Sequence, residues 1–289
     1  RIVIILTIFY SLYPCHAGIN GFVRIAAIRV SFIEDDSPGT TGNGSFLLNA
    51  PIDTCGRYTI DPVPHDRSYF ESQLIAVNSY YRSVSYGKFG IDFNESTVFP
   101  LSDEDSYVLP EKMDYYHPYN QTDLHDQRIT ELFRDAIETA YNDDEINFSN
   151  YDHVVVFHAG IGQDFSLPFL DPTPEDIPST FIDKDMLQEY IGGSLQFGTA
   201  TINQGIILPE PQNHLFYQES ENIFLGADEP CDFQYGLTGT FALMLGFAIG
   251  LPPLWDTDSG QSGIGIFGLM DQGSNNGRGL IPSPPDAWS

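Results

Sequence analysis

The spacing of apolar and polar residues predicts strands and helices in the first third of the chain. Residues 22–32 are rich in β-branched and aromatic side chains and predict a strand. From Phe70 to Val84 the apolar residues recur at intervals of three and four, which predicts an amphipathic helix that ends before Gly87. The segment YGKFGIDF, residues 86–93, then predicts a second strand.

The same pattern continues further along the chain. Residues 126–141 place apolar side chains on one helical face, which we expect to pack on a sheet. Residues 153–160, HVVVFHAG, predict a buried strand flanked by helices. Residues 162–235 lack sustained periodicity and predict irregular structure with short strands and one small helix near 186–190. Residues 238–250 predict a core helix that Thr238 caps, because apolar residues occur on every side of it.

This order of elements predicts a single α/β or α+β domain, with a mixed sheet, packed helices and one buried helix. An apolar run at residues 2–17 follows an arginine and ends in Ala17, as in a secretory signal peptide. The alternative interpretation of this run is a buried strand. We therefore expect residues 1–17 to be a partial signal peptide and residues 18–289 to be the domain, truncated at its C-terminus, in a secreted or cell-surface protein.

Charge and cysteine content limit the classes of partner. The chain has 40 acidic and 12 basic residues and a formal charge of −28, so its field repels nucleic acid and anionic lipid. We expect no nucleic-acid partner and no membrane span after removal of the signal. Once Cys15 is removed with the signal, Cys55 and Cys231 can form one disulfide or stay as two thiols.

The segment GLPPLWDTDSGQSGIGIFGLM, residues 250–270, resembles the stretch that follows the zinc helix in secreted metallopeptidases of the immune inhibitor A family. In that family an HExxH helix precedes Gly-Leu-Pro, a Tyr/Trp-Asp pair and a Leu-Met turn. Four further segments resemble family landmarks in the same order, and the resemblance spans roughly residues 22–289. They are residues 80–91, 105–116, 155–165 and 285–289.

In the register that this resemblance implies, the two zinc-binding histidines of the family fall on Leu243 and Phe247. The catalytic glutamate falls on Met244. Zinc peptidases need two imidazoles four residues apart and a carboxylate that takes a proton from the metal-bound water. Leucine, phenylalanine and methionine supply none of these groups. We therefore expect no catalytic residues at this site and no bound zinc.

Other chemistry has less support in the sequence. No two of the seven histidines lie four residues apart, and His158 is more typical of a satisfied structural histidine than of a ligand. No serine fits the G-x-S-x-G nucleophile turn. Asp256 and Asp258 lie two residues apart in a glycine-rich loop and could offer oxygens to calcium. Chance pairing is the other explanation, because acidic residues are so abundant.

The sequence thus favours a secreted metallopeptidase-like domain without HExxH zinc chemistry, which acts as a non-catalytic surface binding or structural module. Its partner would be a protein or a glycan that the sequence does not identify. The alternative is an active secreted metallopeptidase or other hydrolase whose catalytic residues the sequence does not reveal. A fold can be kept while its chemistry is lost, so the fold alone does not decide between the two.

Overall fold

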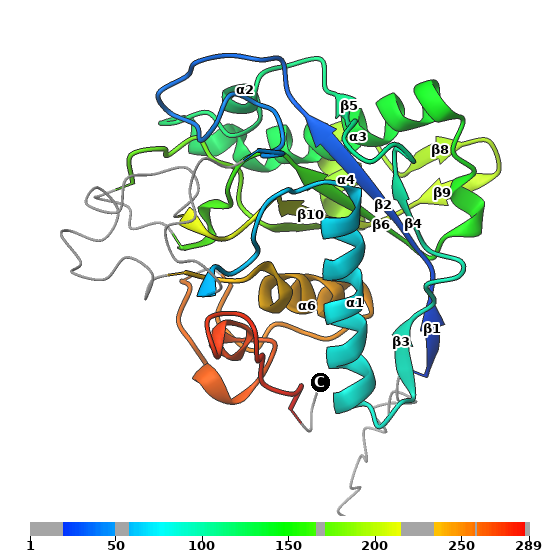
Figure 1. The fold of residues 1–289 in the computed structure, drawn as a ribbon, viewed down its shortest axis with the longest axis vertical. Helices are drawn as coiled ribbons and strands as arrows, with labels where there is room; N and C mark the ends of the chain where they lie inside the picture. The colour runs from blue at the N-terminus through cyan, green and yellow to red at the C-terminus, as the bar shows by residue number, and fades with distance from the viewer. Residues whose placement is uncertain (1–19, 50–57, 166–170, 215–233, 258, 287–289) are drawn as a thin grey trace, which may run out of the picture.

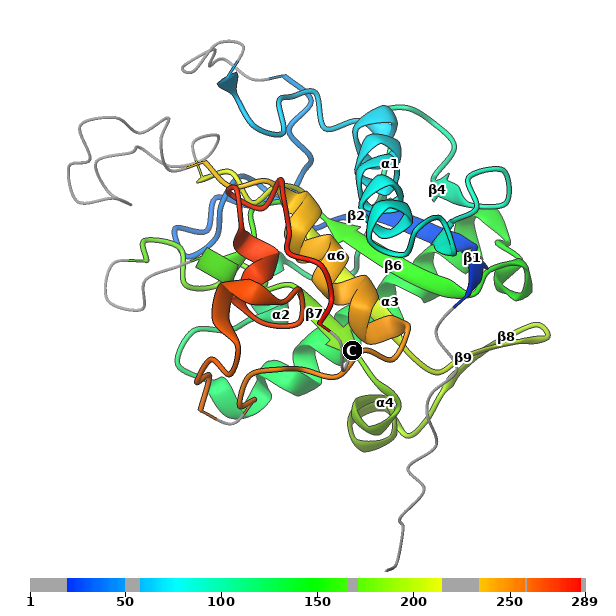
Figure 2. The ribbon, with the colours of Figure 1, turned by 90° about the horizontal axis from the view of Figure 1, so that it is seen from below.

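The computed structural model describes residues 20–49, 58–165, 171–214, 234–257 and 259–286 of the chain. These residues form a mixed α/β fold around a six-stranded sheet with helices on both faces (Figures 1 and 2). The strand order is β4-β2-β6-β10-β7, and β5 also pairs with β2. All pairings in this sheet are parallel except that of β7, which runs antiparallel to β10. The expectation of a mixed sheet with packed helices is confirmed.

The strands are β1 Gly21–Val23, β2 Ile25–Ser31, β3 Phe89–Ile91, β4 Thr97–Phe99, β5 Tyr107–Val108, β6 His153–His158, β7 Thr180–Ile182, β8 Leu195–Phe197, β9 Ala200–Ile202 and β10 Gly205–Pro209. The α-helices are α1 Arg67–Val84, α2 Met113–Tyr116, α3 His125–Asp144, α4 Lys184–Ile191 and α6 Leu237–Ala248. Strands β1 and β3 form a small parallel sheet, and β8 and β9 form an antiparallel hairpin.

The three central strands are mostly apolar because helices cover both faces of the sheet. Every residue of β2 and β10 is buried, and in β6 only the first is not. The strand predicted at residues 22–32 is present but divided into β1 and β2 at Arg24. The backbone N–H of Arg24 donates to Asp152 Oδ2 at 2.8 Å, and its guanidinium binds the same carboxylate. The irregular region expected at residues 162–235 contains one strand, β10, that lies inside the sheet.

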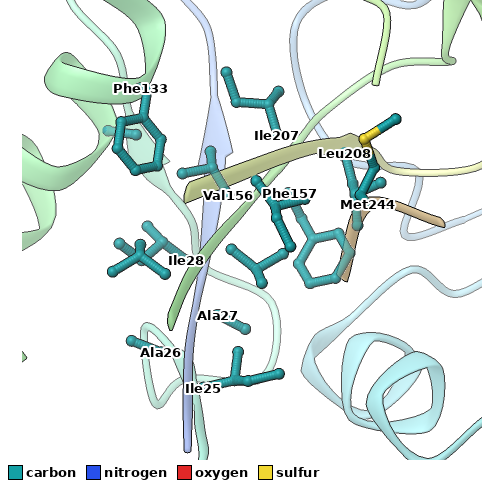
Figure 3. Packing of buried hydrophobic residues seen from close by; sticks show 14 of the residues in the cluster. Ile25, Ala26, Ala27, Ile28, Phe133, Val156, Phe157, Ile207, Leu208 and Met244 are labelled. Carbon is teal, nitrogen blue, oxygen red and sulfur yellow. The ribbon is translucent and has the colours of Figure 1, made fainter. Parts of the chain in front are cut away.

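Helices α1 and α6 cover one face of the sheet, and α3 and α4 lie on the other (Figure 2). Figure 3 shows Ile28 and Val156 directed toward Phe133 of α3, and Phe157 directed toward the opposite side. There the ring of Phe157 packs 4.7 Å from that of Phe70 in α1 and 5.6 Å from a phenylalanine of α6, measured between centroids. The docking of the 126–141 helix on the sheet is therefore confirmed.

Hydrogen bonds fix the two helices on the α6 face. The side chain of Asp66 caps α1 by accepting from Tyr69 N, and the helix ends before a turn in which Gly87 has a φ of 76°. Tyr81 of α1 donates its hydroxyl to the carbonyl of Ala242 in α6 at 2.7 Å. This bond joins the two helices inside the core.

Helix α6 is the expected core helix, but its predicted cap is wrong. Ten of its 12 residues are buried. The N-cap residue is Gly236, and Thr238 lies inside the first turn without capping it. The N–H of Leu237 instead donates to Asp61 Oδ2 at 2.8 Å. The cap is missed because its carboxylate comes from a residue distant in sequence, whereas helix start signals are local.

Several sequence expectations lie outside the described residues: the signal peptide at 1–17, Cys55, Cys231, Asp258 and the end of the chain at 287–289. Among the helices that the structure describes, none has the length and apolarity needed to cross a bilayer.

Candidate functional site

The positions that the resemblance assigns to zinc chemistry lie on the middle and last turns of α6. Met244 is 9% exposed, and Leu243 and Phe247 are half-buried against the core. The ring of Phe247 stacks on Phe181 of β7, with centroids 5.9 Å apart and planes at 23°. On its other side Phe247 meets Trp255 edge-on at 5.6 Å and 77°. Aromatic packing around Phe247 therefore covers part of this helix face.

The Leu-Met turn of the motif lies directly against α6. Leu269 and Met270 are fully buried, and the carbonyl of Met270 accepts the N–H of Leu254 at 2.9 Å. A Cβ atom added to Gly246 would lie 2.6 Å from Met270 Sδ, so a larger residue here would require the Met270 side chain to move. Gly246 is thus explained by packing of the turn on the helix.

Asp271, which follows the turn, holds the glycine-rich loop in place. Its Oδ2 accepts the N–H groups of Gly263, Ile264 and Gly265 at 2.8–2.9 Å, and the hydroxyl of Ser262 at 3.0 Å. Desolvation acts to raise the pKa of Asp271, but the backbone hydrogen bonds outweigh it and the pKa is lowered. The sequence analysis missed this residue, although an acid directly after the turn was a visible signal. Its bonds indicate a structural role.

The proposed calcium loop is described only in part. Asp256 is exposed, and its Oδ1 accepts the N–H of Ser259 at 3.1 Å while its carbonyl accepts that of Gly260 at 2.8 Å. These bonds make Asp256 the first residue of a turn. Asp258 lies outside the described residues, so the pair is not tested. In the part of the chain that the structure describes, no three His, Cys, Asp or Glu side chains are grouped to hold a metal ion.

A buried ion pair, which the sequence analysis missed, lies at the carboxyl end of the sheet. Glu210 follows β10, and its Oε1 lies 2.7 Å from Nδ1 of His65. The same oxygen accepts the N–H of Leu47 at 2.6 Å, and Oε2 accepts that of Gly160 at 3.0 Å. Both side chains of the ion pair have no exposed surface. Glu210 therefore ties three loops to the end of β10.

Electrostatics favour the charged form of this pair. Burial acts to lower the pKa of His65, but the hydrogen bond and the charge of Glu210 outweigh it, and the pKa is raised above 6.5. A pair with no exposed surface has no access to a substrate in this conformation. The pair therefore holds the loops together, and we do not consider it a candidate catalytic acid or base.

His158 lies in the core, where the sequence analysis expected a structural histidine. It has no exposed surface, and its Nδ1 donates to the carbonyl of Ala159 at 2.9 Å. Its Nε2 is buried, and the backbone of Ile177 also acts on the ring. Burial lowers the pKa of His158 to about 4, so the ring is neutral at pH 7.

Comparisons of the chain with protein-family models, with curated proteins and with solved structures found no match.

Proposed function

We propose that the chain is a secreted, metallopeptidase-like domain without zinc chemistry, which serves as a non-catalytic binding module. The observation that supports this most directly is the apolar character of Leu243, Met244 and Phe247 on α6. None of the three offers a nitrogen or oxygen to a metal, and none can take a proton from water.

The packing of these residues supports the same conclusion. Phe247 is stacked against Phe181 and in edge contact with Trp255. Aromatic pairs of this kind contribute about 0.5–1.5 kcal/mol each beyond the area they bury. Apolar residues thus stabilise the helix at the positions where an active peptidase would carry polar zinc ligands. This is the result expected if the fold is kept for binding and not for catalysis.

The loop beside this cluster offers a surface for a partner. Residues 254–267 carry Ile266 and Phe267, which are 54% and 81% exposed. Exposed apolar side chains that lie together on a folded protein are typical of interaction sites. The partner remains a protein or a glycan, as the sequence analysis expected.

The experiment is elemental analysis and peptidase assay of protein purified without added metal. We expect no stoichiometric zinc and no chelator-sensitive cleavage of unstructured casein. One equivalent of zinc would instead support the alternative of an active hydrolase. Casein hydrolysis that an inhibitor of any protease class abolishes would support it too.

Two designed variants sharpen this test. Leu243→His with Met244→Glu and Phe247→His restores the ligands and the base, and we expect it to regain zinc only in part, because groups that orient the ligands are not restored. The matched variant with Met244→Gln restores the ligands without the base. If wild-type protein already binds as much zinc as these variants, the proposed register is wrong.

Secretion is tested separately. Mass spectrometry of exported protein should find its N-terminus at or near Gly18, because Ala17 ends the apolar run. An exported protein that retains residues 1–17 would contradict the signal-peptide proposal.

A further inference from the structure

A pocket of about 490 Å³ opens at the end of the sheet where β6 and β10 begin. It lies between hairpin strand β9 and the short 3-10 helix η3, Phe148–Asn150, which leads into β6. Figure 1 shows β8 and β9 extending beside this end of the sheet. The hydroxyls of Ser149 and Thr199 lie 2.8 Å apart and join η3 to the hairpin. The volume is within the range of about 300–1,000 Å³ typical of small-molecule sites.

The wall of this pocket offers hydrogen bonds without free charge. Residues that line it include Ser149, Thr201, Asn203 and Gln204. Each of these side chains already has one hydrogen-bonding partner in the protein, and each keeps further donor or acceptor capacity for a ligand. Of the described residues that line the pocket, only Asp152 has a formally charged side chain. Its two oxygens accept from the Nε and terminal nitrogen of Arg24 at 3.0 and 2.8 Å, which compensates the charge.

A histidine in the wall is also uncharged. Burial lowers the pKa of His153, and the charge of Asp152 offsets this only in part. Its Nδ1 is buried and has no hydrogen-bonding partner among the described residues. A neutral imidazole has one donor and one acceptor, so rotation of the ring could offer either to a hydroxyl group.

Aromatic rings complete the wall. Phe148 and Tyr151 line the pocket, and Phe197 packs against Phe148 at 5.8 Å between centroids. Phe197 also packs against Tyr141 of α3 at 5.0 Å, which fixes the hairpin on the body of the fold. Phe148 is only 3% exposed, so Tyr151, which is half-buried, is the lining aromatic residue with surface left for a ligand. The pocket therefore combines one partly exposed aromatic residue with hydroxyl and amide groups.

We propose that this pocket binds a neutral sugar, as a free mono- or disaccharide or as the end of a glycan. A sugar ring presents C–H surface to aromatic side chains and hydroxyls that both donate and accept, which matches the wall. An anionic ligand would find no free cation there and would be repelled by the formal charge of −28. The pocket contains none of the α6 residues, so this proposal is independent of the proposed loss of zinc chemistry.

The test is saturation-transfer NMR and calorimetry on the purified chain. The probes are the methyl glycosides of glucose, galactose, mannose and N-acetylglucosamine. We expect at least one of them to bind saturably at millimolar concentration, and glucose 6-phosphate to bind more weakly than glucose. Thr201→Ala with Asn203→Ala should raise the dissociation constant about tenfold, because two hydrogen-bonding groups are lost.

The matched control is Thr122→Ala with Asn142→Ala, which removes the same side chains from exposed positions outside the pocket. It should leave binding unchanged. The proposal is overturned if none of the four glycosides binds, if the charged sugar binds best, or if the pocket and control variants behave alike. Thermal unfolding of both variants shows whether lost binding reflects lost structure.

Discussion

Replacing Gly239 of α6 by alanine should destabilise the domain, although alanine is the better helix former. In an exposed helix the change would gain about 1 kcal/mol. Here a Cβ atom would lie 2.0 Å from the carbonyl oxygen of Ser274 and 3.0 Å from Cα of Gly279. Both contacts are with backbone, which cannot rotate away as a side chain would. Overpacking costs about 1–3 kcal/mol, and a contact with backbone belongs at or above the upper end of this range. After the gain of about 1 kcal/mol in helix propensity is subtracted, we expect a net loss of stability of about 2 kcal/mol.

The assay is thermal unfolding followed by far-UV circular dichroism, where this loss should lower the melting temperature by roughly 4–8 °C. Gly246→Ala should cost less, because its Cβ would meet the side chain of Met270, which can change rotamer. Asn142→Ala, at an exposed position near the end of α3, reports the gain in helix propensity alone. If Gly239→Ala is as stable as wild type or more stable, residues 274–279 do not lie on α6 as described.

Three further predictions concern the ion pair, the aromatic cluster and calcium. The unfolding free energy, measured by urea titration, should fall as pH rises from 6.5 through the raised pKa of His65, because the native state holds a proton that the unfolded state releases. Glu210→Gln should remove that pH dependence, and an unchanged slope would contradict the ion pair. Phe247→Ala should cost about 2–3 kcal/mol in the same assay, less than a fully buried phenylalanine, because it is half-buried; no loss would contradict the stacking. Any rise in melting temperature that calcium causes should vanish in Asp256→Ala with Asp258→Ala, and a rise that survives would place the site elsewhere.

Local periodicity was enough to locate α1, α3 and β6, because each has a stripe or run that points to one solution. It was not enough for β10. The run GIILP between a glutamine and a glutamate looks like any short strand at the edge of a loop. Its place inside the sheet depends on parallel pairing with β6, in which Ile206 lies opposite Val155. Pairing between distant segments leaves no local pattern to recognise.

The candidate site was predictable to the same limited extent. The three residues of α6 were singled out only through the resemblance to the immune inhibitor A family, which stays a prediction, and the structure adds how they pack. The stacking of Phe247 on Phe181 could not be predicted, because it joins a helix to a strand far earlier in the sequence. His65 and Glu210 are 145 positions apart, and a lone histidine or glutamate is unremarkable in so acidic a chain.

The long-range cap of α6 has a consequence for how the chain can be made and divided. Asp61 and Leu237 are 176 positions apart, so the start of this apolar helix is held by a residue synthesised long before the helix itself. A fragment that begins after residue 84 would contain α6 without Asp61, which caps it, and without α1, which packs against it. Such a fragment would expose the apolar part of α6 that α1 covers in the intact domain, and we expect it to aggregate during expression. The loop at 58–66 therefore belongs to the smallest piece of this chain that can fold around α6.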